Sequence, residues 1–438
     1  MKAKRIIVWL VLVVAILFTG CNMRTIDQMY CLPKRSEAYL NLQSAMDSTM
    51  DGLEYHAPIS GDHQQPVQLA DLDGDGHMEC LVFAKGSGEK PLKILIYTAI
   101  EDEYVLVDML EGNGTAFDQV QYVQFSGNRG YDLVVGRQVS DQVVRPVSVY
   151  TMVNGKMEQL LTTQYSRFVS TDLDGNNRNE LLILRPGDDP AQNGIAELYS
   201  MQDGTVERSP EITMSEPADH IKRIMVSRLN DGPTAVYVAS DVDGSAIITD
   251  VYALLDGAFT NVSLSNESGT SVQTLRNYYV YADDIDKDGI LELPDLIALP
   301  NPGSGTYENQ HLIRWYSMNR DGSEVDKLYT YHSFTGGWFI ELPQEIAPNV
   351  NVIQFGNSYE FSVVDNNKKQ SKLMTLYVFT GQEREEQALA DNRFVLYRNE
   401  STVFAAHLDV ASATYNITQD SVKSAFHLIT QDSINGAT

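Results

Sequence analysis

Three short segments of the sequence place carboxylates at alternate positions of a nine-residue stretch that ends in glutamate. The first covers residues 69–83, LADLDGDGHMECLVF, and its candidate ligands are Asp71, Asp73, Asp75, the backbone carbonyl of His77, and Glu79. Without a counter-charge these side chains would repel one another at close range. Ca²⁺ takes six to eight oxygen ligands, and an Asp-x-Asp-x-Asp-Gly loop points alternate carboxylates inward. The spacing therefore predicts a calcium loop, with a solvated turn as the alternative.

The other two segments repeat the pattern, and each also runs into an apolar stretch. STDLDGNNRNELLIL offers Asp172, Asp174, Asn176, the Arg178 carbonyl and Glu180. ADDIDKDGILELPDLIAL offers Asp284, Asp286, Asp288, the Ile290 carbonyl and Glu292. An EF-hand would need a bidentate glutamate at position 12 and flanking helices. Position 12 of the first loop is Val82, within a strand-like run. We therefore expect about three calcium sites in a β context.

The intervals between the loops indicate an internal repeat. Asp71 and Asp172 are 101 residues apart, and Asp172 and Asp284 are 112 apart. Each interval contains a weaker copy. One is VQFSGNRGYDLVVG, with Gln124, Ser126, Asn128 and Asp132 at the ligand positions, and the other is SRLNDGPTAVYVAS, which begins near Arg228. The period is therefore roughly 50 residues, and each period has about four short apolar runs, as a β-propeller blade does.

The chain resembles the FG-GAP/VCBS-type β-propeller repeats of integrin α-chain heads and many bacterial surface proteins. In that family a D-x-D-x-D-G-x-x-D/E loop joins the first and second strands of a blade and holds Ca²⁺. The resemblance covers about 67–335, is specific in three loops and is loose in the two weaker copies. The chain departs from the family at position 9, where Asp is common, and at Asn176, which lowers the charge of the second loop. The resemblance implies an all-β propeller.

The remaining apolar runs are assigned to the same fold. About six more strands are expected between 338 and 409, which predicts about seven four-stranded blades over 51–410, closed by strands from both chain ends. Six blades is the alternative. Helical spacing predicts one helix over 36–50 before the first blade. A second short helix is predicted within 411–438, with Thr418 or Asp420 as its N-cap.

The N-terminus reads as a secretion signal. Lys2, Lys4 and Arg5 precede an apolar run that is short for a membrane span and that ends in LFTGC. This stretch resembles a bacterial lipobox, which implies a signal peptide over 1–21, a lipid on Cys21 and a linker over 22–35. An uncleaved N-terminal anchor is the alternative. Both place the chain outside the cytoplasm, tethered to a membrane.

Composition limits the partners. The net charge is −27, and removal of residues 1–21 makes it −30 because that segment has three cations and no anions. Such a chain repels phosphates, so we expect no nucleic-acid partner. Extracellular calcium suits weak sites with dissociation constants of about 10⁻⁴–10⁻³ M. Cys31 and Cys80 are expected as free thiols, because one lies in the linker and the other in a buried strand.

Catalytic motifs are missing from the sequence. It contains no G-x-S-x-G, H-E-x-x-H or G-x-x-x-x-G-K-[ST] pattern, so no catalytic residue is assigned. Trp315 and Trp338 either fill the core or line a face that stacks on sugar rings. The leading hypothesis is a monomeric, non-catalytic module that binds a protein or glycan in adhesion or as a scaffold. The alternative is a polysaccharide-degrading lyase or hydrolase, since some calcium-binding propellers are lyases.

Overall fold

The computed structural model describes residues 37–100, 103–139, 145–187, 189, 192–277, 280–300 and 310–429. The predicted signal peptide, Cys21, Cys31 and the linker over 22–35 lie outside the described residues, as does the end of the C-terminal tail from residue 430. None of the described helices has the length and hydropathy needed to span a membrane.

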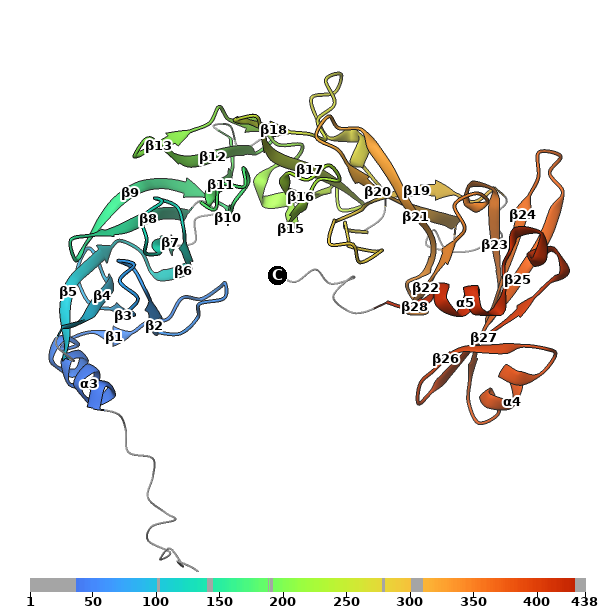
Figure 1. Cartoon of the computed structure of the whole chain (residues 1–438), viewed down its shortest axis with the longest axis horizontal. Helices are drawn as coiled ribbons and strands as arrows, with labels where there is room; N and C mark the ends of the chain where they lie inside the picture. The colour runs from blue at the N-terminus through green and yellow to red at the C-terminus, as the bar shows by residue number, and fades with distance from the viewer. Residues whose placement is uncertain are drawn as a thin grey trace, which may run out of the picture.

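Six antiparallel sheets follow one another along an arc (Figure 1). The first sheet contains β1 (Glu54–Tyr55), β2 (Val67–Ala70), β3 (Glu79–Lys85), β4 (Leu92–Ile100) and β5 (Glu103–Gly112). The second contains β6 (Ala116–Val123), β7 (Asp132–Gln138), β8 (Arg145–Val153) and β9 (Lys156–Tyr165). The third contains β10 (Arg167–Thr171), β11 (Glu180–Arg185), β12 (Ile195–Gln202), β13 (Thr205–Arg208) and β14 (Ile212–Thr213).

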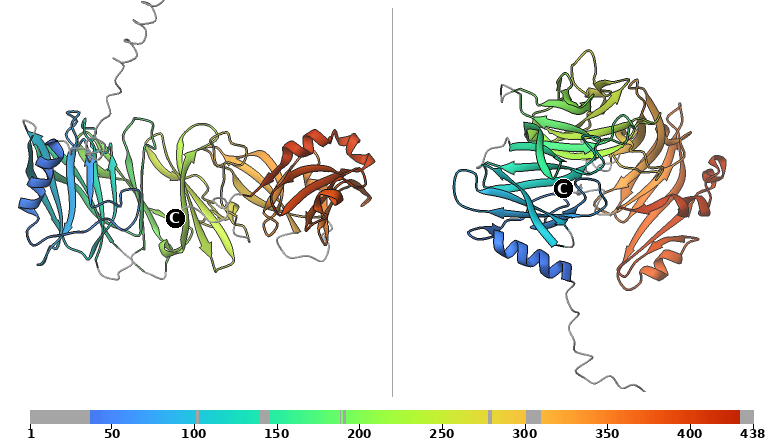
Figure 2. Two further views of the ribbon diagram at one scale, coloured as in Figure 1. Left: turned by 90° about the horizontal axis from the view of Figure 1, so that it is seen from below. Right: turned by 60° about the vertical axis from the view of Figure 1, so that its left-hand side comes forward.

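The other three sheets continue the arc (Figure 2). The fourth contains β15 (Ile221–Arg228), β16 (Thr234–Val242), β17 (Ala246–Leu255) and β18 (Ala258–Asn261). The fifth contains β19 (Leu293–Ala298), β20 (His311–Met318), β21 (Glu324–Ser333), β22 (Trp338–Leu342) and the distant β28 (Phe426–Leu428). The sixth contains β23 (Val350–Phe355), β24 (Ser358–Val364), β25 (Gln370–Thr380), β26 (Phe394–Arg398) and β27 (Thr402–Leu408).

Helices are few and short. The longest is α3 (Glu37–Thr49), where the sequence predicted a helix over 36–50. The others are α4 (Arg384–Leu389), α5 (Gln419–Ala425), and the 3₁₀ turns η1 (Ala218–His220), η2 (Val272–Thr274), η4 (Ala347–Asn349) and η5 (Val410–Tyr415). Thr418 caps α5, because its hydroxyl accepts from the Ser421 backbone N–H while the Ser421 hydroxyl forms the reciprocal bond. The predicted all-β propeller-like fold with short terminal helices is confirmed. The described residues form six sheets, which matches the alternative of six blades rather than the leading prediction of about seven.

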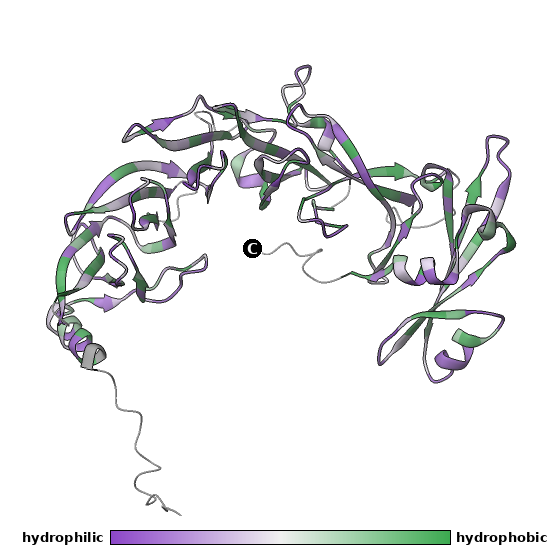
Figure 3. Ribbon diagram, viewed as in Figure 1, coloured by the Kyte–Doolittle hydropathy of each residue, from purple (hydrophilic) through white to green (hydrophobic). Residues whose placement is uncertain are grey.

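The burial pattern shows why these segments are strands. The inner strand β3 is an apolar run that is buried at nearly every position, because the second sheet packs on one of its faces and helix α3 packs on the other. The outer strand β5 instead alternates between exposed and partly buried residues, as an edge strand with one solvent-exposed face does. Figure 3 shows hydrophobic positions along the strands of all six sheets. The first sheet is therefore buried on its inner strand and exposed to solvent at its outer edge.

One hairpin turn recurs in three sheets. Asn154-Gly155, Asp203-Gly204 and Asp256-Gly257 join the third strand to the fourth in the second, third and fourth sheets, and all six residues have positive φ. Two consecutive left-handed residues match the right-handed twist of the strands, which is why Asn-Gly and Asp-Gly are favoured there.

The core is a series of layers between neighbouring sheets. Phe83 of the first sheet packs on Phe117 of the second, with ring centroids 5.1 Å apart, and Tyr165 and Phe168 lie together between the second and third sheets. Further clusters fill the spaces between later pairs of sheets, and the last one includes α5. Each sheet is therefore held mainly by its immediate neighbours, as in a repeat array.

The two ends of the arc are covered by helices. Helix α3 packs Met46 against Cys80 and Val82 on the outer face of the first sheet. Helix α4 packs Ala388 against Phe379 and Val403 on the sixth sheet. The expected ring closure is not seen, because no sheet in the described chain combines strands from both ends of the propeller region. The helices bury the apolar faces that ring closure would otherwise have to cover.

Candidate metal centres

Four of the five loop copies join two paired strands of a sheet, and the third acidic loop leads into the first strand of the fifth sheet. The first acidic loop joins β2 to β3 and the second joins β10 to β11. The third leads into β19, where Asp283 and Glu292 form an isolated antiparallel bridge. The two weaker copies join β6 to β7 and β15 to β16. The repeat in the sequence is therefore a repeat of position, because each copy lies directly before a strand of a different sheet.

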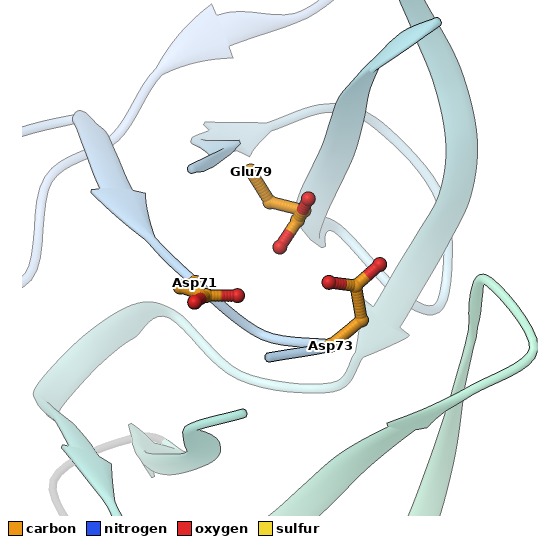
Figure 4. A group of neighbouring side chains, drawn as sticks. All are labelled: Asp71, Asp73 and Glu79. Atoms are coloured by element: carbon orange, nitrogen blue, oxygen red, sulfur yellow. The ribbon is translucent and has the colours of Figure 1, made fainter. Parts of the chain in front are cut away.

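Positions 1, 3 and 9 of each strong loop converge. Asp71, Asp73 and Glu79 each place one carboxylate oxygen within 4.8 Å of the others, and Figure 4 shows the three side chains pointing toward one another. The same grouping occurs for two further triads: Asp172, Asp174 and Glu180, and Asp284, Asp286 and Glu292. Three carboxylates at this separation form a site for a hard cation that prefers oxygen ligands.

The first aspartate of each loop also organises its own turn. Asp71 accepts from the backbone N–H groups of Gly74 and Gly76 at 2.8 and 3.1 Å. In the second loop Asp172 accepts from Gly175 and Asn177 at 2.7 and 2.8 Å. Position 6 of each loop has positive φ, which explains the glycine there in two loops and asparagine in the other. The turn places the first carboxylate over the centre of the loop.

The glutamate at position 9 reaches the same centre from the second strand. Glu79, Glu180 and Glu292 are only 2%, 3% and 0% exposed. One oxygen of each accepts from the backbone N–H of position 2, at 2.8 Å from Leu72, 2.7 Å from Leu173 and 3.1 Å from Ile285. This long side chain thereby spans the loop and fixes its second oxygen near the two aspartates.

Burial and neighbouring carboxylates disfavour the ionised forms of the three position-9 glutamates. Burial raises the pKa of Glu79, and burial reinforced by Asp174 and Asp172 raises the pKa of Glu180 to about 7. Burial, together with the charges of Asp286 and Asp288, raises the pKa of Glu292 to about 8. A divalent cation among these groups would stabilise their ionised forms.

The third loop provides the clearest test of whether a cation fits. Glu292 Oε1 and Asp284 Oδ1 are buried and have no hydrogen-bond partner among the described residues. In the first loop the corresponding oxygen, Glu79 Oε1, accepts from the Thr98 hydroxyl at 2.7 Å. Buried carboxylate oxygens are costly when they have neither a hydrogen bond nor a counter-ion. Two such oxygens in one acidic triad fit a bound cation.

The side chain at position 5 of each loop accepts a hydrogen bond from the backbone of its own loop. Asp75, Asn176 and Asp288 each accept the backbone N–H of position 7 at 2.7–2.8 Å, and they lie outside the three triads. Asp288 also accepts from Lys327 Nζ at 2.8 Å. The local backbone donor competes for these side chains. The carbonyls of His77, Arg178 and Ile290 stay predicted ligands.

The turns of the two weaker copies are held by hydrogen bonds and have no acidic triad among the described residues. In the loop between β6 and β7, Asp132 replaces the position-9 glutamate and accepts from the backbone N–H of Phe125 at 2.8 Å. Its other oxygen accepts from the Ser126 hydroxyl at 2.8 Å, so a hydroxyl hydrogen takes the place of a cation. In the fourth sheet, Asn230 donates from Nδ2 to Asn319 Oδ1 at 2.9 Å. Neither copy has an acidic triad in the described part of the chain, and hydrogen bonds hold both turns.

The loops also connect neighbouring sheets. The Tyr131 backbone N–H donates to the Asp71 carbonyl at 2.8 Å, which joins the second sheet to the first metal loop. A Cβ on the adjacent Gly130 would lie 2.2 Å from the Leu72 carbonyl oxygen, so only glycine allows this approach. The second metal loop meets the second sheet through Asn179, which accepts from Gln124 N at 2.9 Å. Loop geometry and inter-sheet packing are therefore coupled.

Sequence and structure comparisons add little to this description. No protein-family model matches the chain, and no curated protein matches it. A protein of solved structure from Lactobacillus plantarum is similar, with 15% identity, 72% of this chain and 86% of that chain covered, and a TM-score of 0.31. An exotype rhamnogalacturonan lyase is similar with 13% identity, 74% and 63% coverage, and a TM-score of 0.27. Structural similarities with TM-scores this low support no conclusion about the function of this chain.

Proposed function

We propose that the chain is a calcium-stabilised binding module of the FG-GAP/VCBS type, held outside the cytoplasm of a bacterium by a lipid on Cys21. It acts without catalysis, as an adhesion or scaffold protein for a protein or glycan ligand. The observation that carries the calcium assignment is the triple occurrence of one acidic triad at one position in three sheets. Calcium sites use oxygen ligands from alternate positions of a loop with a sharp turn, which these three loops provide.

A structural role for the cation is supported by what its ligands contact. Asp71 and Glu79 each accept backbone N–H bonds from their own loop, and the Asp71 carbonyl receives a bond from the next sheet. The raised pKa values of Glu180 and Glu292 follow from burial beside other carboxylates. A cation would lower these pKa values, so the glutamates serve as ligands in this proposal rather than as general bases.

A binding screen tests the ligand part of the proposal. The chain from residue 22 onward, with Cys21 replaced by a soluble tag, is applied to a glycan array and used in a pull-down from envelope extract, in each case with Ca²⁺ and with EDTA. We expect calcium-dependent capture of at least one glycan or protein, because EDTA would loosen the loops that join neighbouring sheets. The lyase alternative predicts shortened products when the same chain is incubated with acidic polysaccharides. Cleavage products without stable capture would contradict the binding proposal.

The membrane anchor has its own test. Replacement Cys21→Ser removes the thiol that would carry the lipid, so we expect loss of the protein from the membrane fraction or accumulation of an uncleaved precursor. Cell fractionation and intact-mass measurement distinguish the two results. Cys80→Ser is the matched control, because Cys80 is buried in the first sheet and has no disulfide partner among the described residues. Unchanged mass and fractionation of Cys21→Ser would contradict lipidation.

A further inference from the structure

A cavity of about 230 Å³ adjoins the third metal centre. Its loop side is lined by Tyr281, Asp283, Asp284 and Lys287, and its other wall is the fifth sheet. Asp284 belongs both to this wall and to the third acidic triad. We call this cavity the loop-3 pocket. Its lining includes no residue of the first two acidic triads.

Aromatic rings form a ladder along the sheet side of the pocket. His332 of β21, Phe339 of β22 and His427 of β28 are cross-strand neighbours in one row. The centroids of His332 and Phe339 are 4.8 Å apart with planes at 7°, and those of Phe339 and His427 are 4.8 Å apart at 25°. Phe334 stacks on His332 at 5.0 Å, and Trp315 also lines the pocket. Because the rings stack face to face along this row, they give the pocket an apolar, aromatic wall made largely of ring edges.

His332 is an unsatisfied polar group in this wall. The residue is 7% exposed, and neither Nδ1 nor Nε2 has a hydrogen-bond partner among the described residues. Burial lowers the pKa of His332 to about 3, so the ring is neutral and has one donor and one acceptor nitrogen. A buried polar group without partners costs about 1–3 kcal/mol. A ligand with both hydroxyl donors and acceptors would satisfy it.

The charges around the pocket favour a neutral ligand over an organic cation. The positive charge of Arg223 acts on Asp283, and its guanidinium carbon lies 5.6 Å from the Tyr281 ring centroid. Lys287 adds a second positive group to the wall. Asp284 would share the charge of a cation in the third loop. The two carboxylates are thus compensated, and an ammonium ligand would gain little from them.

We propose that the loop-3 pocket binds one ring of a neutral, hydroxyl-rich ligand, a monosaccharide unit of a glycan. This inference rests on the proposed binding function and specifies its ligand class. A sugar ring has an apolar C–H face that can pack on aromatic rings and hydroxyls that can reach His332, Lys287 and Asp283. A cavity of about 150 Å³ already accommodates benzene, so the loop-3 pocket has room for a substituted six-membered ring.

The test uses small probes on the tagged chain in Ca²⁺. Saturation-transfer NMR and tryptophan fluorescence are measured with methyl glycosides of glucose, galactose and mannose, with choline, and with glucuronate. We expect at least one neutral glycoside to bind and His332→Leu to weaken it about tenfold or more, as expected for a lost buried hydrogen bond. His407→Leu on β27 is the matched control, because His407 Nδ1 is also buried and unpartnered but lies outside the pocket. This control should bind like the parent chain.

Each result decides the inference. If His332→Leu does not fold, judged by its melting curve, Phe334→Ala on the same wall replaces it and should show the same loss. Equal glycoside binding by the pocket variants and the parent would overturn the pocket assignment. Binding of choline or glucuronate alone would overturn the ligand class, and binding of no probe would overturn the inference as a whole. Capture of a protein partner in the binding screen would leave the proposed function intact in all of these cases.

Discussion

Chelation with EDTA is expected to lower the melting temperature of the protein by on the order of 10 °C. A ligand that binds only the folded state stabilises it by about 2.7 kcal/mol per site at 100-fold excess over its dissociation constant. Three sites would contribute about 8 kcal/mol, which in a chain of 438 residues corresponds to a shift of this size. Differential scanning calorimetry in Ca²⁺ and in EDTA measures the shift.

Variants in single loops show whether the shift comes from the three triads. Asp73→Ala, Asp174→Ala and Asp286→Ala each remove one triad carboxylate, so calorimetric titration should find two calcium ions in place of three. Asp231→Ala is the matched control, because Asp231 lies in a weaker copy and pairs with Arg320 at 2.9 Å. It should retain three ions. A parent chain with the same melting curve in both buffers, and no metal by elemental analysis, would rule out the calcium loops.

The loops differ in charge in a way that the sequence only partly reveals. The number of acidic ligands predicts that the second loop has the lowest calcium affinity, because Asn176 replaces an aspartate. The structure adds that Lys327 binds Asp288 and lowers the pKa of that carboxyl, so the third loop also has less free negative charge than its sequence suggests. Lys327 lies 39 residues after Asp288, on β21. The sequence does not predict this contact, because it depends on how β21 packs beside the third loop in the folded chain.

Local patterns predicted the parts of the fold that local chemistry decides. Asp-x-Asp spacing located the acidic loops, each of which lies directly before a strand. Thr418 was identified as a possible cap because threonine before a helical run can accept a backbone N–H. These features depend on residues within one turn of one another. They require no knowledge of distant partners.

The features that the sequence did not predict depend on distant contacts. Ring closure was expected, but α3 and α4 cover the terminal sheets, and apolar spacing alone does not say which face a helix will cover. The loop-3 pocket is completed by β28, whose His427 Nε2 lies 2.7 Å from Glu341 Oε1, 86 residues earlier in the chain. The hydrogen bond from the His77 backbone N–H to Asp75 was also not predicted, and Asp75 stays a predicted ligand through its other oxygen. Each case is a choice between partners that only the folded chain resolves.

The pH dependence of stability should depend on calcium. In EDTA, the folded protein holds protons on Glu180 and Glu292 up to pKa values of about 7 and about 8, whereas the ordinary value is 4.5. The folded state then binds more protons than the unfolded state in this interval, so the free energy of unfolding falls as pH rises from about 4.5 to about 8. Each pKa unit corresponds to about 1.4 kcal/mol. Thermal melts in EDTA across this interval measure the loss.

Calcium should remove this loss, because it binds the ionised glutamates and its affinity rises as they deprotonate. The gap between the melting temperatures in Ca²⁺ and in EDTA is therefore expected to widen from pH 5.5 to pH 8.5. Repulsion among the many acidic side chains of the chain also grows with pH. The variant Glu292→Gln is therefore needed to separate the contribution of the buried loop glutamate from this general repulsion. This variant should flatten the EDTA profile, whereas Glu267→Gln, at an exposed glutamate, should leave it unchanged. If the two variants give the same profile, general charge repulsion rather than the buried triads sets the pH dependence.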